Sequence, residues 1–296
     1  MKWIELILSF ECNCRCLVCP ASLQPASAKM SSGEIDGWLE HGLSQGAEGV
    51  WFGGGEPTLH PDLIASIERA RQLGYVIRKI QTNGLRFAYQ PFTKRCLQAG
   101  ANQFSMSIKG PDAKTHDGIT QNPGSFVHLT RAVENLVAQS AKVEADILIT
   151  KENLTGLAAC IEFFAGLGIK RFYFWLFSLH GLDFEANKKH LPSFSEIRPR
   201  LEAAFETAAR LQVEATSFHT PPCILSPEFQ DRYVHSGSLD LAVITPGSQP
   251  FMAEDSPMEG GQFLTGCAKC IIRPNCLGLR KDYLDLFGPE EFKALS

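Results

Sequence analysis

The sequence predicts an α/β fold: a partial (β/α)6 barrel of the TIM type, followed by a small cysteine-rich C-terminal domain. From residue 3 to about residue 212, short apolar runs alternate with longer helical patterns. Such alternation gives a parallel sheet with right-handed crossovers. Six units of this kind are too few for a closed eightfold barrel. The alternation stops near residue 212, so we assign residues 1–212 to the barrel and 213–296 to the second domain.

Each unit combines an apolar run of strand length with a stretch whose apolar residues recur at helical spacing. In chain order the pairs are Ile4–Phe10 with Glu34–Ser44, Gly49–Phe52 with Pro61–Leu73, Val76–Gln81 with Phe92–Ala99, Gln103–Ile108 with Ser125–Gln139, Val143–Ile149 with Leu154–Leu167, and Arg171–Phe177 with Phe194–Leu211. Trp175 and Phe177 alternate within the sixth strand and are interpreted as barrel core. Beyond residue 212, Leu239–Ile244 and the Pro-Gly-Ser-Gln-Pro turn predict a β-hairpin, and a short helix is expected around Lys281–Leu286.

The residues that follow the predicted strands mark one end of the barrel as the site. In (β/α) barrels the chemistry lies at the C-terminal ends of the strands. The segments at these ends are the Cys12 loop, Gly53–Pro57, Thr82–Gly84, Ser107–Lys109, Thr150–Asn153 and Ser178–His180. Ordinary βα loops are polar too, but that does not explain the cysteine-rich and glycine-rich loops together. Lys109 and His180 are weaker candidates for substrate contacts.

Composition excludes several classes of protein. The chain has 296 residues and a formal net charge of −4, so nothing in its overall charge favours nucleic-acid binding. No uninterrupted apolar stretch is long enough for a membrane span, and the N-terminus is interpreted as a strand rather than a signal peptide. The ten cysteines are clustered, which favours metal binding over a disulfide framework. We therefore expect a reducing, cytoplasmic location.

The most informative motif is a C-x3-C-x2-C set formed by Cys12, Cys16 and Cys19. Three thiolates on one loop can hold three corners of a [4Fe–4S] cluster and leave one iron open. Cys14 lies between them and is interpreted as a spare thiol. The alternative is a zinc site that uses all four cysteines, although zinc sites usually draw ligands from two separated segments.

The cysteine set followed by Gly53-Gly-Gly-Glu-Pro-Thr58 resembles the radical S-adenosylmethionine (radical SAM) enzymes. The resemblance implies that S-adenosylmethionine binds the open iron and is cleaved to a 5′-deoxyadenosyl radical, which abstracts a substrate hydrogen atom. It also implies a partial barrel, in agreement with the strand pattern. Cys12, Cys16 and Cys19 match the cluster ligands of the family one for one.

The same resemblance implies the residues that bind S-adenosylmethionine. Those expected to contact or shape the cofactor pocket are Gly54, Gly55, Glu56, Pro57, Thr82, Asn83, Ser107, Arg131 and Asn153. The glycine turn matches the segment that contacts the methionine part, and Glu56 either contacts the ammonium group or holds the turn in shape. Arg131 resembles an arginine that pairs with the cofactor carboxylate; the alternative is a solvated helix residue.

A second set, Cys267, Cys270 and Cys276, resembles the C-terminal extension of radical SAM enzymes with an auxiliary cluster, called twitch or SPASM. Adding Cys223 would give four-cysteine ligation of a second [4Fe–4S] cluster. Structural zinc is one alternative. Another is that Cys223 is a bystander and the substrate ligates the cluster directly. Cys96 and Cys160 fall in helical patterns and are interpreted as packed core thiols.

The predicted function is therefore that of a radical SAM oxidoreductase or maturase that modifies a peptide of ribosomal origin. An alternative is a dehydrogenase or related enzyme acting on a sugar or aminocyclitol, and a non-enzymatic alternative is an iron–sulfur electron-transfer protein. Expected partners are a peptide or small-molecule substrate and a low-potential electron donor such as flavodoxin or ferredoxin. Because only eleven residues precede Cys12, two alternatives stay open: a separate protein supplies a leader-peptide-binding domain, or the substrate is small.

Overall fold

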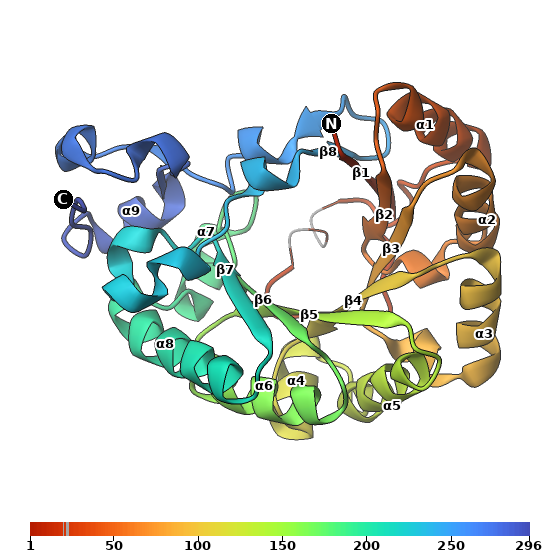
Figure 1. The fold of residues 1–296 in the computed structure, drawn as a ribbon, viewed down its shortest axis with the longest axis horizontal. Coiled ribbons are helices and arrows are strands. Elements are labelled where there is room, and N and C mark those ends of the chain that lie inside the picture. The colour runs from red at the N-terminus through yellow and green to blue at the C-terminus, as the bar shows by residue number, and fades with distance from the viewer. Residues whose placement is uncertain (20, 22–23) are drawn as a thin grey trace.

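The computed structural model describes residues 1–19, 21 and 24–296. Strands and helices alternate through the barrel as the sequence predicts (Figure 1). The strands are β1 (Trp3–Ser9), β2 (Gly49–Gly54), β3 (Ile77–Thr82), β4 (Gln103–Ile108), β5 (Lys142–Ile149), β6 (Arg171–Leu176), β7 (Glu214–Phe218), β8 (Leu241–Ile244), β9 (Phe251–Met252), β10 (Gly261–Gln262) and β11 (Leu279–Arg280). The α-helices are α1 (Ser32–Ser44), α2 (Leu63–Leu73), α3 (Gln90–Ala99), α4 (Ala113–Thr120), α5 (Ser125–Val137), α6 (Leu157–Gly166), α7 (Phe184–Asn187), α8 (Phe194–Arg210) and α9 (Lys281–Phe287).

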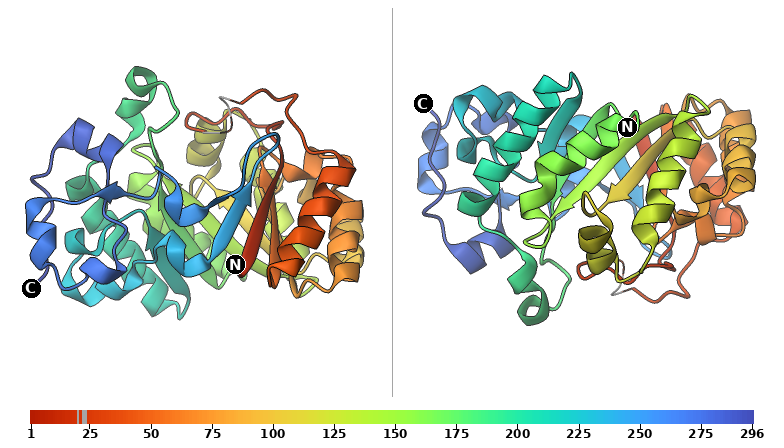
Figure 2. Two further views of the ribbon diagram at one scale, coloured as in Figure 1. Left: turned by 90° about the horizontal axis from the view of Figure 1, so that it is seen from above. Right: turned by 90° about the horizontal axis from the view of Figure 1, so that it is seen from below.

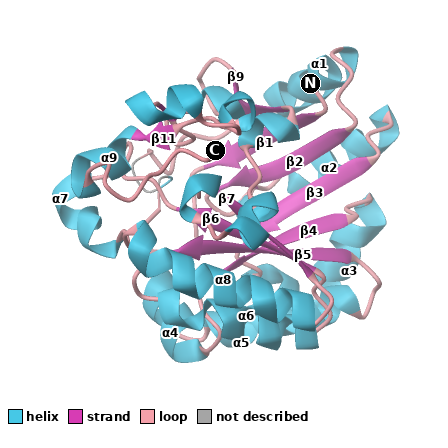
Figure 3. Ribbon diagram, turned by 60° about the vertical axis from the view of Figure 1, so that its left-hand side comes forward, coloured by secondary structure: helices cyan, strands magenta, loops and turns pink. Residues whose placement is uncertain are grey.

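The principal sheet is an open barrel. Within the described residues it has nine strands in the order β7-β6-β5-β4-β3-β2-β1-β8-β9. Strands β1 to β8 pair in parallel, and β9 runs antiparallel to β8. The sheet curves around a central space while the helices lie on its outer side (Figures 1 and 3). This arrangement confirms the predicted partial (β/α) barrel.

Side chains on successive residues of each strand point to opposite faces of the sheet. Ile4, Leu6 and Leu8 of β1 are at most 1% exposed and pack against the helices. The intervening Glu5 and Ile7 point to the inner face, which we call the lumen. The outer face thus forms the hydrophobic core, whereas the lumen contains polar and charged residues that are available to a ligand.

Helix α4 was not predicted from the sequence. It spans only eight residues, and its first turn is capped by Asp112, which accepts a hydrogen bond from the Thr115 N–H at 2.8 Å. Eight residues are too few to show a clear helical spacing of apolar residues. It matters for the site because the C-terminal end of α4 supports the loop after β1.

The chain beyond residue 212 contributes both to the sheet and to the segment beside it. β7 forms one edge of the sheet, and β8 pairs with β1. The predicted hairpin is confirmed as β8 and β9, and the short C-terminal helix as α9. Figure 2 shows the C-terminus on the far side of the molecule from α1 and α2. The domain boundary near residue 212 stays a prediction. Among the described residues, no helix combines the length and apolarity that a membrane crossing requires.

Candidate active site

The cysteine loop lies at the C-terminal end of β1 and is fastened to α4. The backbone N–H of Arg15 donates to the carbonyl of Thr120 at 3.0 Å, and that of Leu17 donates to Ile119 at 2.9 Å. These bonds use carbonyl groups at the end of α4 that have no partner within the helix. The loop is therefore held on a rigid element rather than standing alone.

Cys12 is exposed, while Cys16 and Cys19 are half-buried. Burial raises the pKa of Cys16; Lys109 opposes this, and the thiols of Cys19 and Cys12 add to it. These electrostatic effects indicate that the three thiols lie near one another and near the ammonium group of Lys109. The donor set is three thiols on one accessible loop, the chemistry expected of ligands to an iron–sulfur cluster with one open iron.

The described residues contain no group of three or more His, Cys, Asp or Glu side chains arranged to hold a single metal ion. The iron corners of a cubane cluster keep its ligand sulfurs further apart than one ion would. The number and accessibility of the thiols on this loop fit such a cluster.

Cys14 is buried beneath the loop. Its sulfur accepts hydrogen bonds from the amide groups of Asn83 at 3.6 Å and Asn122 at 3.7 Å. A hydrogen bond with Cys12 and burial raise the pKa of Cys14 far above its ordinary value, so this thiol stays protonated. The same hydrogen bond lowers the pKa of Cys12 to about 7. Cys14 is thus held beneath the loop, away from its exposed side.

The glycine turn after β2 packs directly against the end of β1. Gly54 has a φ of 131°, and a Cβ atom there would collide with the carbonyl of Ser9. A Cβ atom on Gly55 would collide with the carbonyl of Glu11. The Gly55 N–H donates to Ser9 at 2.8 Å, and the next N–H donates to Glu11 at 2.8 Å. These glycines bring the turn and the cysteine loop together.

The carboxylate of Glu56 is 1% exposed and holds this turn in shape. It accepts hydrogen bonds from the Thr58 N–H at 3.1 Å and the Thr58 hydroxyl at 2.6 Å. The Thr82 hydroxyl and the Asn83 N–H each donate to it at 2.8 Å. Burial raises the pKa of Glu56, and these donors oppose the rise. Of the two roles open to Glu56, holding the turn accounts for every hydrogen bond that the carboxylate makes with the described residues.

Asn83 links the end of β3 to the cysteine loop. Its side-chain amide donates to the Asn13 side-chain oxygen at 2.7 Å and approaches the Cys12 sulfur at 3.8 Å. Its side-chain oxygen accepts from the Leu85 N–H at 3.1 Å. Pro57 is buried at the start of a short 3₁₀ helix, Pro57–Leu59. The predicted residues Gly54 to Pro57, Thr82 and Asn83 therefore form one connected group around the cysteine loop.

Three further residues were predicted to contact the cofactor, and the structure places them in different surroundings. Ser107 is half-buried on the lumen side near the end of β4. Asn153 is 1% exposed, and its amide donates to the carbonyls of Lys109 at 3.1 Å and Leu148 at 2.7 Å. It thus joins the ends of β4 and β5. Arg131 is exposed on α5, opposite the buried face of that helix, and forms no ion pair with the described residues. The structure does not bring Arg131 to the other site residues.

Sequence reasoning missed two sets of residues. Asn122, in the loop between α4 and α5, donates to the Asn13 carbonyl at 3.0 Å as well as to the Cys14 sulfur. The Asn122-Pro-Gly turn signal could have drawn attention to it. The polar residues of the lumen, among them Glu5, Lys79 and Asp146, were also missed. Their signal is the presence of charged residues inside predicted strands, such as Glu144 and Asp146 at alternate positions of β5.

The second cysteine set lies beside the barrel. Four thiols line one cavity, those of Cys223, Cys267, Cys270 and Cys276. Burial raises the pKa of Cys223 to about 12, and the other three thiols add to this effect. The Cys276 sulfur accepts a hydrogen bond from the Gly278 N–H at 3.3 Å. Segments separated by more than forty residues in sequence thus place four thiols around one space.

The surroundings of this cavity also suit an anionic cluster. The positively charged side chains of Arg273 and Lys293 line it, and the Arg273 guanidinium lies 3.4 Å from the centre of the Phe263 ring. A cluster with four thiolate ligands carries net negative charge, which these cations would balance. The donor set and the local charge therefore fit a four-cysteine [4Fe–4S] site.

The pair Arg280–Asp282 attaches the cysteine-rich segment to the barrel. Arg280 is 4% exposed and donates to the carbonyls of Leu176 at 2.9 Å and Phe177 at 2.8 Å. Asp282 forms an ion pair with it at 2.8 Å and accepts from the Leu179 N–H at 2.6 Å. Burial tends to raise the pKa of Asp282, but the charge and hydrogen bonds of Arg280 outweigh it, so the pKa lies below its ordinary value.

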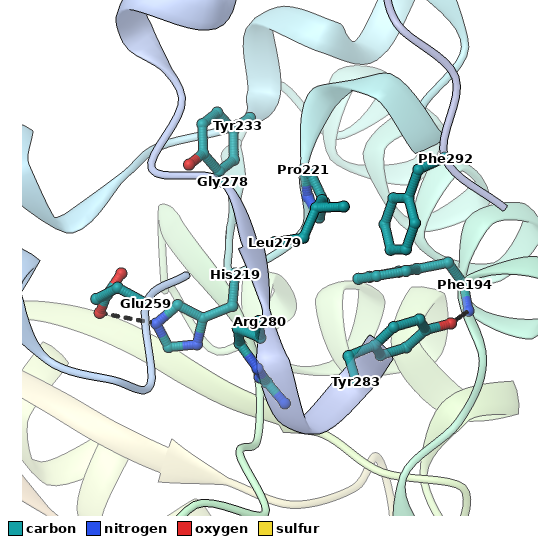
Figure 4. A pocket seen from close by; sticks show the side chains of 10 residues that line it. All are labelled: Phe194, His219, Pro221, Tyr233, Glu259, Gly278, Leu279, Arg280, Tyr283 and Phe292. Carbon is teal, nitrogen blue, oxygen red and sulfur yellow. Dashed lines mark hydrogen bonds and ion pairs between the residues drawn. The ribbon is translucent and has the colours of Figure 1, made fainter. Parts of the chain in front are cut away.

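Figure 4 shows the pocket between this segment and the barrel, with His219 and Arg280 side by side. His219 has a φ of 62°. Its Nδ1 lies 3.0 Å from the carbonyl of Leu176, and its Nε2 lies 2.9 Å from the carboxylate of Glu259. Both ring nitrogens thus face oxygen atoms of neighbouring segments. His219 also contacts the edge of Trp175, whose ring stacks on Phe218 at 3.9 Å.

Phe177 is buried in the core, while Trp175 faces the lumen. The predicted candidate His180 is exposed.

Comparison with known proteins identifies the class. The sequence profile of the Radical SAM superfamily matches residues 6–164, more than half of the chain, and the protein belongs to this superfamily. It is accordingly an enzyme whose cofactors are a [4Fe–4S] cluster and S-adenosylmethionine. The matched region contains the cysteine loop, the glycine turn and the ends of β3, β4 and β5.

Curated relatives match the barrel part of the chain. The AdoMet-dependent heme synthase of Oleidesulfovibrio alaskensis is 26% identical over 168 residues, which cover 56% of this chain and 43% of that protein. The mycofactocin maturase MftC of Mycobacterium tuberculosis is 31% identical over 156 residues, 51% of this chain and 38% of that protein. The chain spans about half the length of the curated relatives it matches, or less.

Solved structures share the fold over the whole chain. Streptococcus suis SuiB bound to its precursor peptide SuiA has a TM-score of 0.70 and 15% identity, covering 100% of this chain and 75% of SuiB. The protein anSMEcpe with bound AdoMet and the Cp18Cys peptide also has a TM-score of 0.70, with 14% identity, and covers 99% of this chain and 92% of that one. At this level of identity the likeness establishes the fold.

Proposed function

We propose that this enzyme modifies a peptide by hydrogen-atom abstraction and that it uses an auxiliary [4Fe–4S] cluster beside the barrel. The observation that carries the proposal is the cavity lined by Cys223, Cys267, Cys270 and Cys276. A radical SAM enzyme without an auxiliary cluster has no need of a second four-thiol site. The full-chain likeness to SuiB and anSMEcpe, both solved with peptides, supports a peptide substrate.

In this proposal Cys12, Cys16 and Cys19 hold the first cluster, and the four C-terminal cysteines hold the second. When bound, the first cluster and S-adenosylmethionine supply a carbon-centred radical able to remove a substrate hydrogen atom. Glu56 and Asn83 keep the glycine turn and the cysteine loop in register. Arg280 keeps the second site at a fixed place beside the end of β6.

The partners follow from this chemistry. A low-potential donor such as flavodoxin or ferredoxin supplies electrons, and the substrate is a peptide. The relatives that act on small molecules, such as the heme synthase, motivate a second candidate, a dehydrogenase acting on a sugar or aminocyclitol. The two candidates differ in which substrate forms a modified product.

The first experiment is an iron and product assay on anaerobically reconstituted protein. We expect about eight irons per chain from two four-iron clusters, and release of 5′-deoxyadenosine when dithionite and S-adenosylmethionine are added. Replacing Cys12, Cys16 and Cys19 together with Ala should leave about half of the iron and abolish cleavage. Cys14→Ala is the matched control, because it removes a thiol of the same loop that we do not assign to the cluster.

Mass spectrometry of candidate substrates separates the functions. A mass change in a short peptide encoded beside the gene supports the maturase, whereas a change only in an aminocyclitol supports the dehydrogenase. A protein that holds iron but releases no 5′-deoxyadenosine would have to be an electron carrier. A wild-type chain with only four irons after full reconstitution would contradict the auxiliary cluster, and one that binds zinc alone would contradict both clusters.

A further inference from the structure

The lumen contains a cavity lined by residues of β1 to β8, among them the first residues of β1, β4 and β8, which are Trp3, Gln103 and Leu241. Trp51, Tyr173 and Trp175 contribute aromatic walls, while Lys79, Glu144 and Asp146 contribute charged groups. The cavity is separate from the thiol-lined space and lies on the wall that leads up to the glycine turn, because Trp51 precedes Gly53 on β2. None of these residues has a role in the cluster sites described above.

The ammonium group of Lys79 is neutralised within this wall. It lies 3.3 Å from Glu144 and 4.0 Å from the centre of the Trp51 ring. Glu144 also accepts a hydrogen bond from the Gln103 amide at 2.7 Å. Lys79 and Glu144 are 8% and 2% exposed. Glu144 also faces Arg171 at 3.6 Å and Lys142 at 3.8 Å, and the charge of Lys79 acts on Glu5 as well.

Among the described residues, Asp146 forms no ion pair with a cationic side chain. Its carboxylate accepts hydrogen bonds from the Gln81 amide at 3.0 Å, the Trp175 indole N–H at 3.2 Å and the hydroxyl of Ser105. All three donors are neutral. They satisfy the oxygen atoms but leave the negative charge of Asp146 uncompensated in a buried place, where such a charge is costly.

Glu5 adds a second carboxyl group to this region. On β1 it is paired in register with Trp51, and its Oε1 lies 2.7 Å from the position that a Cβ atom on Gly53 would take. Glu5 therefore lies between the glycine turn and the cavity. No described residue donates a hydrogen bond to it. Burial raises the pKa of Glu5 to about 7; the charge of Lys79 lowers it, and that of Asp146 raises it.

The indole N–H of Trp51 gives evidence for a bound ligand that does not depend on the carboxylates. The residue is 8% exposed, and its indole N–H is buried without a hydrogen-bond partner among the described residues. Buried N–H groups are nearly always paired. An oxygen atom of a bound molecule in the cavity would provide the acceptor.

From this arrangement we propose that the lumen cavity binds a protonated amine of the substrate, together with a nearby oxygen atom. The amine is attracted by Glu5 and Asp146 and by the aromatic faces, and the oxygen accepts from Trp51. The proposal rests on the proposed function and narrows its substrate class. A lysine side chain or N-terminus of a peptide has this chemistry, and an aminocyclitol is its other source.

One consequence is a coupling between amine binding and proton release. Below a pH of about 7 Glu5 carries a proton, and an incoming positive charge favours its ionised form. Binding should therefore release part of a proton per site at pH 6.5. The affinity should increase as the pH rises toward 8, where a lysine amine is still protonated.

Calorimetry on the reconstituted holoenzyme with S-adenosylmethionine tests this directly. The probes are Nα-acetyl-lysine methylamide, its uncharged analogue Nα-acetyl-norleucine methylamide, and trans-2-aminocyclohexanol. Titration in two buffers of different ionisation enthalpy gives the number of protons released. We expect the amines to bind and the norleucine compound to bind at least tenfold more weakly. Tighter binding of the lysine compound favours a peptide source, and tighter binding of the cyclic amino alcohol favours a small molecule.

Two substitutions test which residues bind the amine and the oxygen atom. Glu5→Gln should weaken amine binding about tenfold, the cost of losing a charged hydrogen-bond partner, and abolish proton release. Glu206→Gln, an exposed carboxylate on α8, is the matched control and should change neither. Trp51→Phe keeps an aromatic ring and removes the N–H, so it should weaken the cyclic amino alcohol while proton release continues.

Intrinsic fluorescence provides a second readout, because three of the four tryptophans of the chain line this cavity. Equal binding of the lysine and norleucine compounds to the wild-type protein would overturn the proposal without any variant. So would unchanged proton release in a Glu5→Gln protein with normal iron content. Since binding is measured without turnover, a missing 5′-deoxyadenosine signal would count against the proposed function and not against the amine site.

Discussion

The carboxylate of Glu56 accepts a hydrogen bond from the backbone N–H of Asn83 at 2.8 Å. This bond joins the glycine turn after β2 to the end of β3. The side chain of Asn83 in turn reaches the cysteine loop through Asn13. Three strand ends thus depend on one buried carboxylate, and their relative position determines where a cofactor can lie between them.

Replacing Glu56 with Gln should loosen this connection. A Gln side chain has one oxygen and one NH2 group, so one of the positions that now accept hydrogen bonds would present a donor to another donor. A buried donor left unpaired costs about 1–3 kcal/mol. We expect the affinity for S-adenosylmethionine to fall by about tenfold, measured by equilibrium binding to the reconstituted protein.

The control for this substitution is Glu48→Gln, which changes an exposed carboxylate just before β2. The Glu48→Gln protein should bind S-adenosylmethionine with the affinity of the wild-type protein. Unchanged binding in Glu56→Gln, with the fold intact by circular dichroism, would show that the turn does not depend on this carboxylate.

Arg280 should be a major contributor to the stability of the C-terminal segment. Its replacement by Leu leaves the half-buried carboxylate of Asp282 without its ion-pair partner and removes the donors to Leu176 and Phe177. Breaking one side of a buried ion pair costs about 3–5 kcal/mol. Urea unfolding of the reconstituted protein should show a loss of this order.

The matched control is Arg198→Leu, an exposed arginine of α8, for which a change within about 0.5 kcal/mol is expected. If both variants unfolded at the same urea concentration, the attachment of the segment would have to come from other contacts. Limited proteolysis should then cut neither variant faster than the wild-type protein.

His116 should make the stability depend on pH. Burial lowers the pKa of this histidine to about 4 from an ordinary 6.5, and Lys109 also lowers it. The unfolded chain therefore binds more protons than the folded chain between these values, so stability falls as the pH decreases through this range. Between pH 7 and pH 5 the loss from this residue is about 2 kcal/mol.

Urea unfolding at pH 7 and pH 5 measures this effect. In His116→Gln the loss should disappear, because an amide side chain can still accept the hydrogen bond from the Lys109 N–H that Nδ1 now accepts at 3.2 Å. His41→Gln changes an exposed histidine of α1 and should keep the wild-type pH dependence. Equal pH dependence in all three proteins would contradict a buried neutral His116.

The barrel could be predicted from the sequence because its signal is local. In β1 buried residues alternate with others, as Ile4, Leu6 and Leu8 do around Glu5, and β6 shows the same alternation, whereas β2 is a continuous buried run. The C-terminal ends of parallel strands meet at one rim, so the segments around Gly54 and Thr82 could be placed together. Arg131 shows the limit of this reasoning, since a helix pattern does not reveal whether one charged residue faces the site or solvent.

Other features depend on contacts between distant segments and give no local signal. β8 pairs with β1 although more than two hundred residues separate them. The hydrogen bonds of Glu56 are made by residues on two different loops. The polar lumen was overlooked because Glu5, Lys79 and Asp146 lie on three different strands, and their grouping exists only once the sheet has curved.

The fourth prediction concerns Cys223, which lies forty-four residues before Cys267 in the sequence. Its thiol lines the same cavity as Cys267, Cys270 and Cys276. With four thiolate ligands the auxiliary cluster would have no open iron, so its expected role is to accept an electron from the substrate radical or to hold the segment. Cys223→Ala should therefore lower the iron content toward four per chain and suppress product formation. Cleavage of S-adenosylmethionine should continue, because the cysteine loop is untouched.

Cys160→Ala is the matched control, since this buried cysteine belongs to α6 and to neither set. It should keep about eight irons and form product, apart from the stability lost through a small cavity. Iron analysis and electron paramagnetic resonance of the reduced protein distinguish the variants, because the signal of the first cluster persists in Cys223→Ala. A crystal structure with the Cys223 sulfur beyond bonding distance of iron would refute the assignment. Direct ligation of the auxiliary cluster by substrate would then follow, since one iron would be open to it.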